Sequence, residues 1–288
     1  MLTRIDRVQM AVPDRTVTAR RWEALLGAEP AGEDTIAALA ARRSRLRLGN
    51  GWIELLEPDG AGPIADAVSA RGAHLFAAGA ATTDLGALHA RLEGLGVDAV
   101  EERGQIHIPA GAVGGFGLNL VVSAAEDLPQ AGTLLCLYEV TNLVQDVLAS
   151  LEQFVVAFGL DPDAFVPIES TQYGYAGVLT LFRPRVLDRI EMIHPHDRQK
   201  TMGRFFTRFG DSLYMAFGEC AELALVERRT IEAKAGHTVV PPEQKRAGRP
   251  TDTLFLHPDA LGGMMLGLSR PTVAWRWSGA PDRVEATD

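Results

Sequence analysis

A short motif that occurs twice constrains the fold of this chain more than any other feature. Its first copy spans residues 51–58, Gly-Trp-Ile-Glu-Leu-Leu-Glu-Pro, and its second spans residues 188–195, Asp-Arg-Ile-Glu-Met-Ile-His-Pro. Each copy places one carboxylate, Glu54 or Glu191, inside a short apolar run that ends in proline. Such a run is typical of a β-strand, because proline cannot continue the hydrogen-bond ladder. A glutamate held there is either a pocket group or a satisfied structural carboxylate.

The rest of the chain repeats one order of elements. The first part predicts strands near 5–12, 44–48, 52–56, 74–77, 105–108 and 116–122, and helices over 16–26 and near 85–95. The pair 44–48 and 52–56 is expected to form a hairpin that turns at Asn50-Gly51. The β-α-β-β-β order then recurs, with offsets that grow slowly from 132 to 148 residues.

This drifting offset indicates a duplicated α+β protein of four βαβββ modules, arranged as two tandem domains. The predicted parts are an N-terminal domain over 1–123, a linker over 124–133, a C-terminal domain over 134–278 and a tail over 279–288.

Composition narrows the range of partners. The chain has 288 residues, 47% of them hydrophobic, which is enough for one large core or two medium ones. Its formal charge of −9 argues against nucleic acid as a partner. Its two cysteines lie in apolar runs and indicate reduced thiols, and no uncharged apolar run approaches the ~18 residues that a membrane span needs. We expect a cytoplasmic protein with a small-molecule ligand, no nucleic-acid or membrane partner, and a homodimer as one option for its assembly.

Several segments carry a resemblance to a known family. They are residues 5–14, 53–58 and 72–75 in the first half, and residues 255–263 in the second. Together they resemble the vicinal oxygen chelate superfamily, which includes glyoxalase I, methylmalonyl-CoA epimerase, extradiol dioxygenases and bleomycin-resistance proteins. The resemblance implies that each pair of modules curls its sheets around a U-shaped pocket, usually with a divalent metal.

The resemblance also implies four metal-ligand positions in each domain. They hold Arg7, Glu54, His74 and Asn119 in the first domain, and Glu139, Glu191, Leu213 and Gly267 in the second. A catalytic divalent site needs about three protein ligands and an open position. Because Arg7 stays protonated and repels a cation, no metal is predicted in the first domain. Glu139 and Glu191 remain candidates for a metal in the second domain; the alternative is two carboxylates that are hydrogen-bonded or salt-bridged across a polar pocket floor.

One class of function suggested by this set is an enzyme of the glyoxalase type. It would carry out lyase or isomerase chemistry by proton transfer on a small oxygen-rich or anionic molecule. Glu54 would be its base, His74 the partner of that base, and Arg7 would hold substrate oxygen in place of the metal. The expected substrate contacts are Gln9, Trp52, Phe76 and Asn119 in the first domain, and Glu139, Arg189 and Glu191 in the second.

The other class is a binding protein that sequesters a drug or metabolite without chemistry. The state of Glu54 separates the two classes, since a free Glu54 favours catalysis and a tight Arg7–Glu54 pair favours a structural floor. An extradiol-type dioxygenase is a third hypothesis. Its iron needs a His-His-Glu set, whereas the second domain offers Glu139, Leu213 and Gly267.

Overall fold

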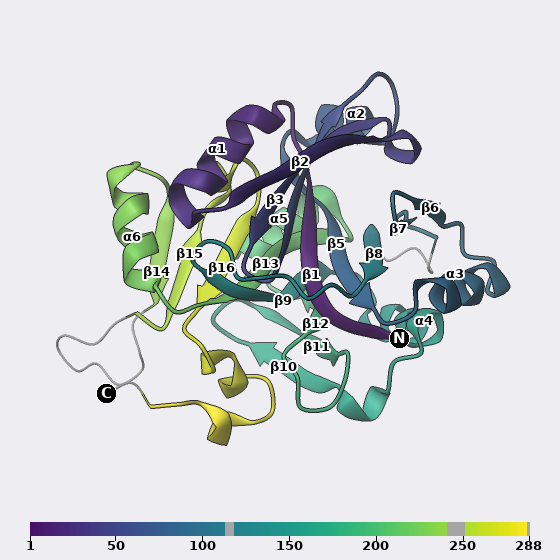
Figure 1. Ribbon diagram of the computed structural model, residues 1–288. Coiled ribbons are helices and arrows are strands. Elements are labelled where there is room, and N and C mark those ends of the chain that lie inside the picture. The colour runs from purple at the N-terminus through teal and green to yellow at the C-terminus, as the bar shows by residue number, and fades with distance from the viewer. Residues whose placement is uncertain (113–117, 241–250, 287–288) are drawn as a thin grey trace. The chain divides into compact units, whose positions relative to one another are not determined.

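A computed structural model describes residues 1–112, 118–240 and 251–286, which form two eight-stranded sheets (Figure 1). The strands of the first sheet are β1 (Leu2–Ala11), β2 (Glu29–Ile36), β3 (Ala41–Leu48), β4 (Gly51–Pro58), β5 (His74–Thr82), β6 (Val100–Glu102), β7 (Gln105–Ile108) and β8 (Leu120–Ala124). The helices between them are α1 (Arg15–Leu26), α2 (Pro63–Arg71) and α3 (Leu85–Gly94). The strand order in this sheet is β2-β3-β4-β1-β5-β8-β7-β6.

The second sheet repeats the first. Its strands are β9 (Leu134–Leu143), β10 (Val166–Ser170), β11 (Tyr175–Leu181), β12 (Arg189–Pro195), β13 (Ser212–Cys220), β14 (His237–Val240), β15 (Thr253–Leu256) and β16 (Met265–Ser269). Its helices are α4 (Val147–Phe158), α5 (Thr201–Phe209), α6 (Leu223–Glu232) and α7 (Pro258–Leu261). Raising each strand number of the first order by eight gives the second order, β10-β11-β12-β9-β13-β16-β15-β14. The predicted α+β class and the duplication of βαβββ modules are therefore confirmed.

The chain also groups into two compact units, and these differ from its two halves. One unit contains Met1–Ile5, Ala77–Glu126 and Glu139–Tyr214, and the other contains Asp6–Phe76, Asp127–Tyr138 and Met215–Asp288. The predicted linker at 124–133 stays a prediction. In the predicted tail, the carbonyl of Glu285 accepts from Arg270 Nη1 at 3.1 Å, and its N–H donates to Thr272 Oγ1 at 2.9 Å. Of the predicted strand 116–122, residues 116–117 lie outside the described part.

The helix ends follow local signals. Asp14, Asp84 and Asp146 cap α1, α3 and α4, each by accepting a hydrogen bond from the backbone N–H three residues on. Gly27 and Gly159 end α1 and α4 with φ of 69° and 60°, a left-handed conformation that glycine adopts without steric cost. None of the described helices is long and apolar enough to cross a membrane.

The strands and helices of the first half that the sequence prediction lacks are β2, α2 and the short β6. Residues 29–36 are mostly exposed, but they form β2 by antiparallel pairing with β3. Residues 63–71, which the sequence places in a glycine-rich connection, form α2 and bury Ile64. Neither segment has a clear apolar period, so tertiary pairing decides its structure rather than local pattern.

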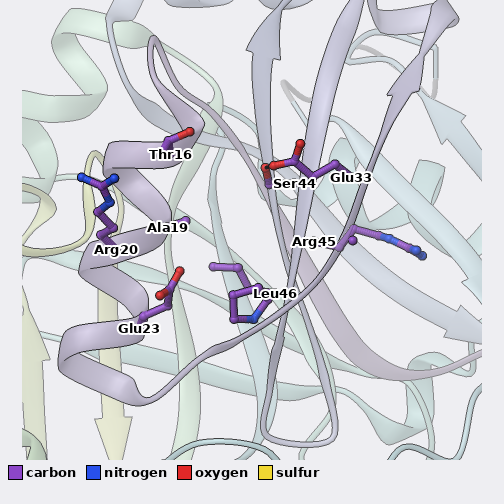
Figure 2. Close-up of a pocket in the computed structure, with 10 residues that line it drawn as sticks. Thr16, Ala19, Arg20, Glu23, Glu33, Ser44, Arg45 and Leu46 are labelled. Carbon is purple, nitrogen blue, oxygen red and sulfur yellow. Dashed lines mark hydrogen bonds between the residues drawn. The ribbon is translucent and has the colours of Figure 1, made fainter.

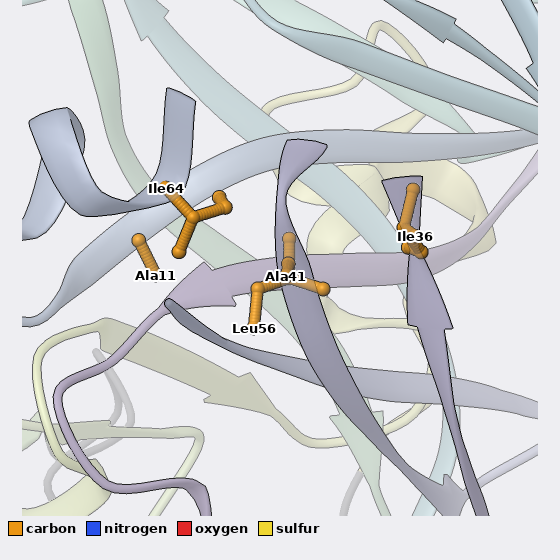
Figure 3. Close-up of a cluster of buried hydrophobic side chains, with 5 residues drawn as sticks. All are labelled: Ala11, Ile36, Ala41, Leu56 and Ile64. Carbon is orange, nitrogen blue, oxygen red and sulfur yellow. The ribbon is translucent and has the colours of Figure 1, made fainter. Parts of the chain in front are cut away.

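Helices α2 and α5 each pack an apolar cluster beside a motif glutamate. The first cluster is Ala11, Ile36, Ala41, Leu56 and Ile64 (Figure 3). The second is Leu143, Ile193, Met202 and Phe206. Leu56 and Ile193 each lie two positions beyond a motif glutamate, on the same strand face. Each glutamate therefore has an apolar neighbour on one side along its strand, and its polar partners must come from adjacent strands.

Gly51 allows β1 to lie close to β4 at the start of the first motif. It pairs with Leu48, so the hairpin loop consists of Gly49 and Asn50 rather than of the predicted Asn50-Gly51. A Cβ at Gly51 would lie 2.2 Å from the carbonyl oxygen of Asp6. The glycine is therefore needed for a backbone contact inside the sheet.

We expect Gly51→Ala to lower the free energy of unfolding by about 1–3 kcal/mol, because β1 and β4 must separate. Urea denaturation measures this change. Gly94→Ala is the control, since a Cβ at Gly94 in α3 meets nothing within 4 Å. A midpoint of Gly51→Ala equal to that of the control would contradict the close approach.

Candidate functional site

The first motif glutamate, Glu54, is fully buried on β4 between β1 and β3. Its Oε2 accepts a hydrogen bond from Gln9 Nε2 at 2.8 Å. Its Oε1 accepts from Arg7 Nη1 at 3.0 Å and from Arg43 Nη1 at 3.3 Å. Two guanidinium groups and one amide therefore hold this carboxylate, and both of its oxygens are used.

Both arginines are also paired at their other ends. Arg7 donates to the two oxygens of Asp6 at 3.1 and 2.7 Å, and both side chains are buried. Arg43 forms the same two-bond fork with Asp34, at 2.8 and 2.7 Å. Burial alone would lower the pKa of Arg43, but the carboxylates of Asp34 and Glu54 raise it above its ordinary value. The result is a closed network of three carboxylates and two guanidiniums, in which each charge has an opposite neighbour.

His74 is not part of this network. It opens β5, is 9% exposed, and its Nδ1 lies 2.8 Å from the carbonyl oxygen of Gly72. Burial lowers its pKa, and the nearby charge of Arg71 acts in the same direction. Among the described residues, no hydrogen bond or ion pair joins His74 to Glu54. The predicted base and its predicted partner are therefore not linked.

The other predicted contacts of the first domain have different surroundings. Trp52 lies under two guanidiniums, those of Arg45 at 5.3 Å and Arg47 at 5.4 Å from the ring centre. Phe76 meets the His74 ring edge-on, with centroids 6.4 Å apart, and packs against the cluster of Figure 3. The side-chain oxygen of Asn119 accepts a hydrogen bond from the Ala110 N–H at 2.7 Å. Of the four predicted contacts, Gln9 donates a hydrogen bond to Glu54.

The second copy of the site is arranged differently. Arg189 on β12 binds Glu139 on β9 through Nε at 2.6 Å and Nη2 at 2.5 Å. Glu191 accepts a hydrogen bond from Thr141 Oγ1 at 2.6 Å, through its Oε2. All four side chains are at least 95% buried. Glu191 makes no other hydrogen bond with the described residues, so its Oε1 has no protein donor there.

This arrangement changes the acidity of the second site. Burial, followed by the negative charge of Glu139, raises the pKa of Glu191 to about 8, whereas Thr141 and Arg189 act against the rise. Burial also raises the pKa of Glu139, and Arg189 opposes that rise. Because Arg189 contacts Glu139 directly, it favours the ionised form of Glu139 more than that of Glu191. Burial and the charges of Glu191 and Glu139 also raise the pKa of the neighbouring Tyr175.

Register relates the two copies position by position. Arg7 pairs across the strands with Trp52, and Glu139 pairs with Arg189 in the same way. The positive charge thus lies on β1 in the first copy and on β12 in the second. It binds the motif glutamate Glu54 in the first copy, whereas in the second it binds the neighbouring Glu139. The duplicated fold therefore presents one neutralised carboxylate and one carboxyl group that keeps its proton near neutral pH.

The side chains do not fit the divalent metal that the family resemblance implies. Within residues 1–112, 118–240 and 251–286, no three His, Cys, Asp or Glu side chains gather to hold a metal. A Cβ at Gly267, where a ligand is expected, would lie 2.2 Å from the ring of Phe217. That ring stacks on Tyr138 and meets Phe255 edge-on, with centroids 6.1 and 5.8 Å apart. Leucine at 213 and arginine at 7 supply no metal-binding atom, so we assign no step to a metal.

A surface cavity of about 220 Å³ lies elsewhere, between α1 and the β2–β3 hairpin. Figure 2 shows Thr16, Arg20 and Glu23 of α1 on one side and Glu33, Ser44 and Leu46 of the hairpin on the other. None of the predicted site residues lines this cavity. Its charged groups are of both signs and Glu33 is largely exposed, so it does not compete with the two buried sites as a reaction centre.

Comparison with known proteins defines the fold. No model of a known protein family matches the chain, and no curated protein sequence matches it. A triple mutant of 4-hydroxymandelate synthase from Streptomyces coelicolor matches 93% of this chain and 93% of its own, with a TM-score of 0.67 and 14% identity. A fusion of a xylose isomerase-like TIM barrel with 4-hydroxyphenylpyruvate dioxygenase matches 94% of this chain and 49% of its own, with a TM-score of 0.64 and 13% identity.

A methylmalonyl-CoA epimerase from Streptomyces coelicolor, 22% identical, covers 43% of this chain and 100% of its own with a TM-score of 0.38, which is too low to support an argument. The chain therefore has the fold of the vicinal oxygen chelate superfamily, in a two-domain form with four modules. At these sequence identities the comparisons show the fold alone and not the activity.

Three parts of the two sites are missing from the sequence prediction. Arg43 and Asp34 lie on β3 and β2, and β2 has no strand pattern. The β3–β4 register, which pairs Arg45 with Glu54, would have indicated an arginine beside the glutamate. Asp6 was not expected beside Arg7, because consecutive residues of a strand point to opposite faces. Thr141, by contrast, shares a face with Glu139, and strand alternation does predict it as a pocket residue of the second domain.

Proposed function

We propose that the protein is an enzyme that transfers protons on a small oxygen-rich molecule, in reactions of the isomerase or lyase type, with Glu191 as its acid and base. The observation that carries this proposal is the buried position of Glu191, where Thr141 holds one carboxyl oxygen and the other has no donor among the described residues. Burial there raises the pKa of Glu191 to about 8. A group whose pKa lies near the working pH can both take up and return a proton. The ionised carboxylate would remove a proton from a carbon next to a carbonyl group, and the resulting acid would return it.

The neighbours of Glu191 support this role as positioning residues. The ion pair of Arg189 and Glu139 keeps a negative charge beside Glu191, and this charge favours the protonated form. Thr141 fixes one carboxyl oxygen and leaves the other without a donor among the described residues. That second oxygen is the atom through which we expect Glu191 to reach a substrate.

For the first site we propose the structural alternative. Glu54 already accepts hydrogen bonds from Arg7, Arg43 and Gln9. A base needs a carboxylate oxygen that is free to take up a proton, and both oxygens of Glu54 already accept hydrogen bonds. The predicted catalytic set of Glu54, His74 and Arg7 is therefore replaced in this proposal by Glu191 and its positioning neighbours.

Hydrogen–deuterium exchange tests the proposal. The protein is incubated in D2O with a panel of small 2-oxo acids and ketones, and loss of the α-proton signal is followed by NMR. We expect exchange that increases with pH up to about 8, since the base form must be ionised. Glu191→Gln should reduce the rate about 10²–10⁴-fold.

Glu169→Gln is the matched control, because Glu169 is an exposed glutamate on β10 of the same sheet. Exchange that survives in Glu191→Gln would disprove the assignment. Thermal stabilisation by a panel member without exchange in the wild type would instead support the second class, a protein that binds a small molecule without chemistry.

A further inference from the structure

Arg45 has no anionic partner within ion-pair distance among the residues that the structure describes. It lies on β3 directly opposite Glu54, and its side chain points away from α1 in Figure 2. Within the described residues it makes no hydrogen bond and no ion pair, and its Nε is buried without an acceptor. Its group is instead held over the ring of Trp52, 5.3 Å from the centroid.

The other arginines around Arg45 already have partners in the protein. Arg7 is paired with Asp6 and Glu54, and Arg43 is paired with Asp34 and Glu54. Arg47, the second cation over Trp52, donates to the carbonyl of Pro129. Arg45 therefore adds a positive charge that no carboxylate of the described chain neutralises within ion-pair distance.

We infer that Arg45, positioned by Trp52, binds a small oxyanion, that is, a carboxylate or a phosphate. A guanidinium offers five N–H donors in a planar fork that matches two oxygens of such an anion. The indole fixes the orientation of this fork by a cation–π contact, so less side-chain freedom is lost on binding. Arg45 and Trp52 are both half-buried, which leaves the group reachable while it is shielded from bulk water.

This site is separate from the one in the proposed function. Arg45 and Trp52 belong to the compact unit of Asp6–Phe76, whereas Glu191 belongs to the other unit. Arg45 thus takes the anion-binding role predicted for Arg7, whose Nε, Nη1 and Nη2 donate to Asp6 and Glu54. Anion binding at Arg45 does not depend on the role proposed for Glu191.

Calorimetric titration of the full chain with inorganic phosphate and, separately, with benzoate at low ionic strength tests the inference. We expect at least one of the two to bind, and added chloride to weaken the binding. Arg45→Met should weaken it at least tenfold. Arg42→Met is the matched control: Arg42 is on the same strand, half exposed and paired with Glu57, and its loss should leave the affinity unchanged.

Arg45→Lys keeps the charge without the planar fork, and we expect it to lose affinity for benzoate. The ratio of phosphate to benzoate affinity in the wild type identifies which oxyanion the site prefers. Absence of binding for both anions would overturn the inference, and so would equal losses in Arg45→Met and Arg42→Met. Circular dichroism of each variant confirms that it is folded, and Glu191→Gln should bind the anion as the wild type does.

Discussion

Glu191→Gln is expected to raise the free energy of unfolding near pH 9 by on the order of 5 kcal/mol, and to change it little near pH 5. The pKa of Glu191 is raised from the ordinary carboxyl range of roughly 4.5 to about 8, chiefly by burial. Each unit of such a shift corresponds to about 1.4 kcal/mol. Ionising this carboxyl group inside the folded protein is therefore costly, and glutamine removes that cost while keeping the shape.

The direction with pH follows from proton binding. Between about pH 4.5 and 8 the folded protein holds a proton on Glu191 that the unfolded chain has released. The contribution of Glu191 to stability is therefore highest at low pH and falls as the pH rises through this window. The difference between Glu191→Gln and the wild type should increase over the same window and level off above about pH 8.

Urea denaturation at several pH values measures this difference. Glu169→Gln, which changes an exposed glutamate on β10, should show no such pH dependence. A difference that stays constant between about pH 5 and 9 would mean that Glu191 titrates normally, and the proposed acid–base role would lose its main support.

The sequence was sufficient for the fold because the duplication is visible in short-range patterns. Capping aspartates, stopping glycines and the two glutamate strands recur in order, and each is a local signal. The strand β2 and the helix α2 carry no such signal. We attribute their formation to the pairing of β2 with β3 and to the packing of α2 on the apolar cluster of Figure 3. These elements are determined by tertiary contacts, and the hydrophobic periodicity of the sequence cannot predict such contacts.

The site could be predicted only in part, for a related reason. Alternation correctly brought Arg7, Gln9 and Glu54 together, because they lie on adjacent paired strands. It could not reveal that Arg43 would also reach Glu54, since that contact depends on the register of the β3–β4 hairpin. Nearby guanidiniums favour the ionised form of a glutamate. How many of them lie close to it depends on how the strands pair and pack in the folded sheet.

The equivalent positions in the second half illustrate the same limit. Sequence placed Glu139, Arg189 and Glu191 in one group, and the group is present. The sequence does not show which carboxylate Arg189 binds. Its pairing with Glu139 leaves Thr141 as the hydrogen-bond donor to Glu191 among the described residues. Function in a duplicated fold can therefore differ between copies through a change of ion-pair partner alone.

Arg7→Met is expected to lower the free energy of unfolding by about 3–5 kcal/mol, the usual cost of removing one member of a buried ion pair. Arg7 is 3% exposed and donates to both Asp6 and Glu54, which are also buried. Methionine fills much of the space but leaves the charge of Asp6 without this guanidinium. Urea denaturation at neutral pH measures the loss, and anion binding at Arg45 should be unchanged.

Two further variants separate loss of charge pairing from loss of packing. Adding Asp6→Asn to Arg7→Met should restore part of the stability, because the carboxylate left behind is then removed. Arg42→Met removes an arginine of the same size that is half exposed on β3, and should cost less than about 1 kcal/mol. If Arg7→Met leaves stability within 1 kcal/mol of the wild type while abolishing exchange or ligand binding, Arg7 acts on substrate after all. In that case the buried network of the first copy is a binding site, and the structural role proposed for Glu54 is wrong.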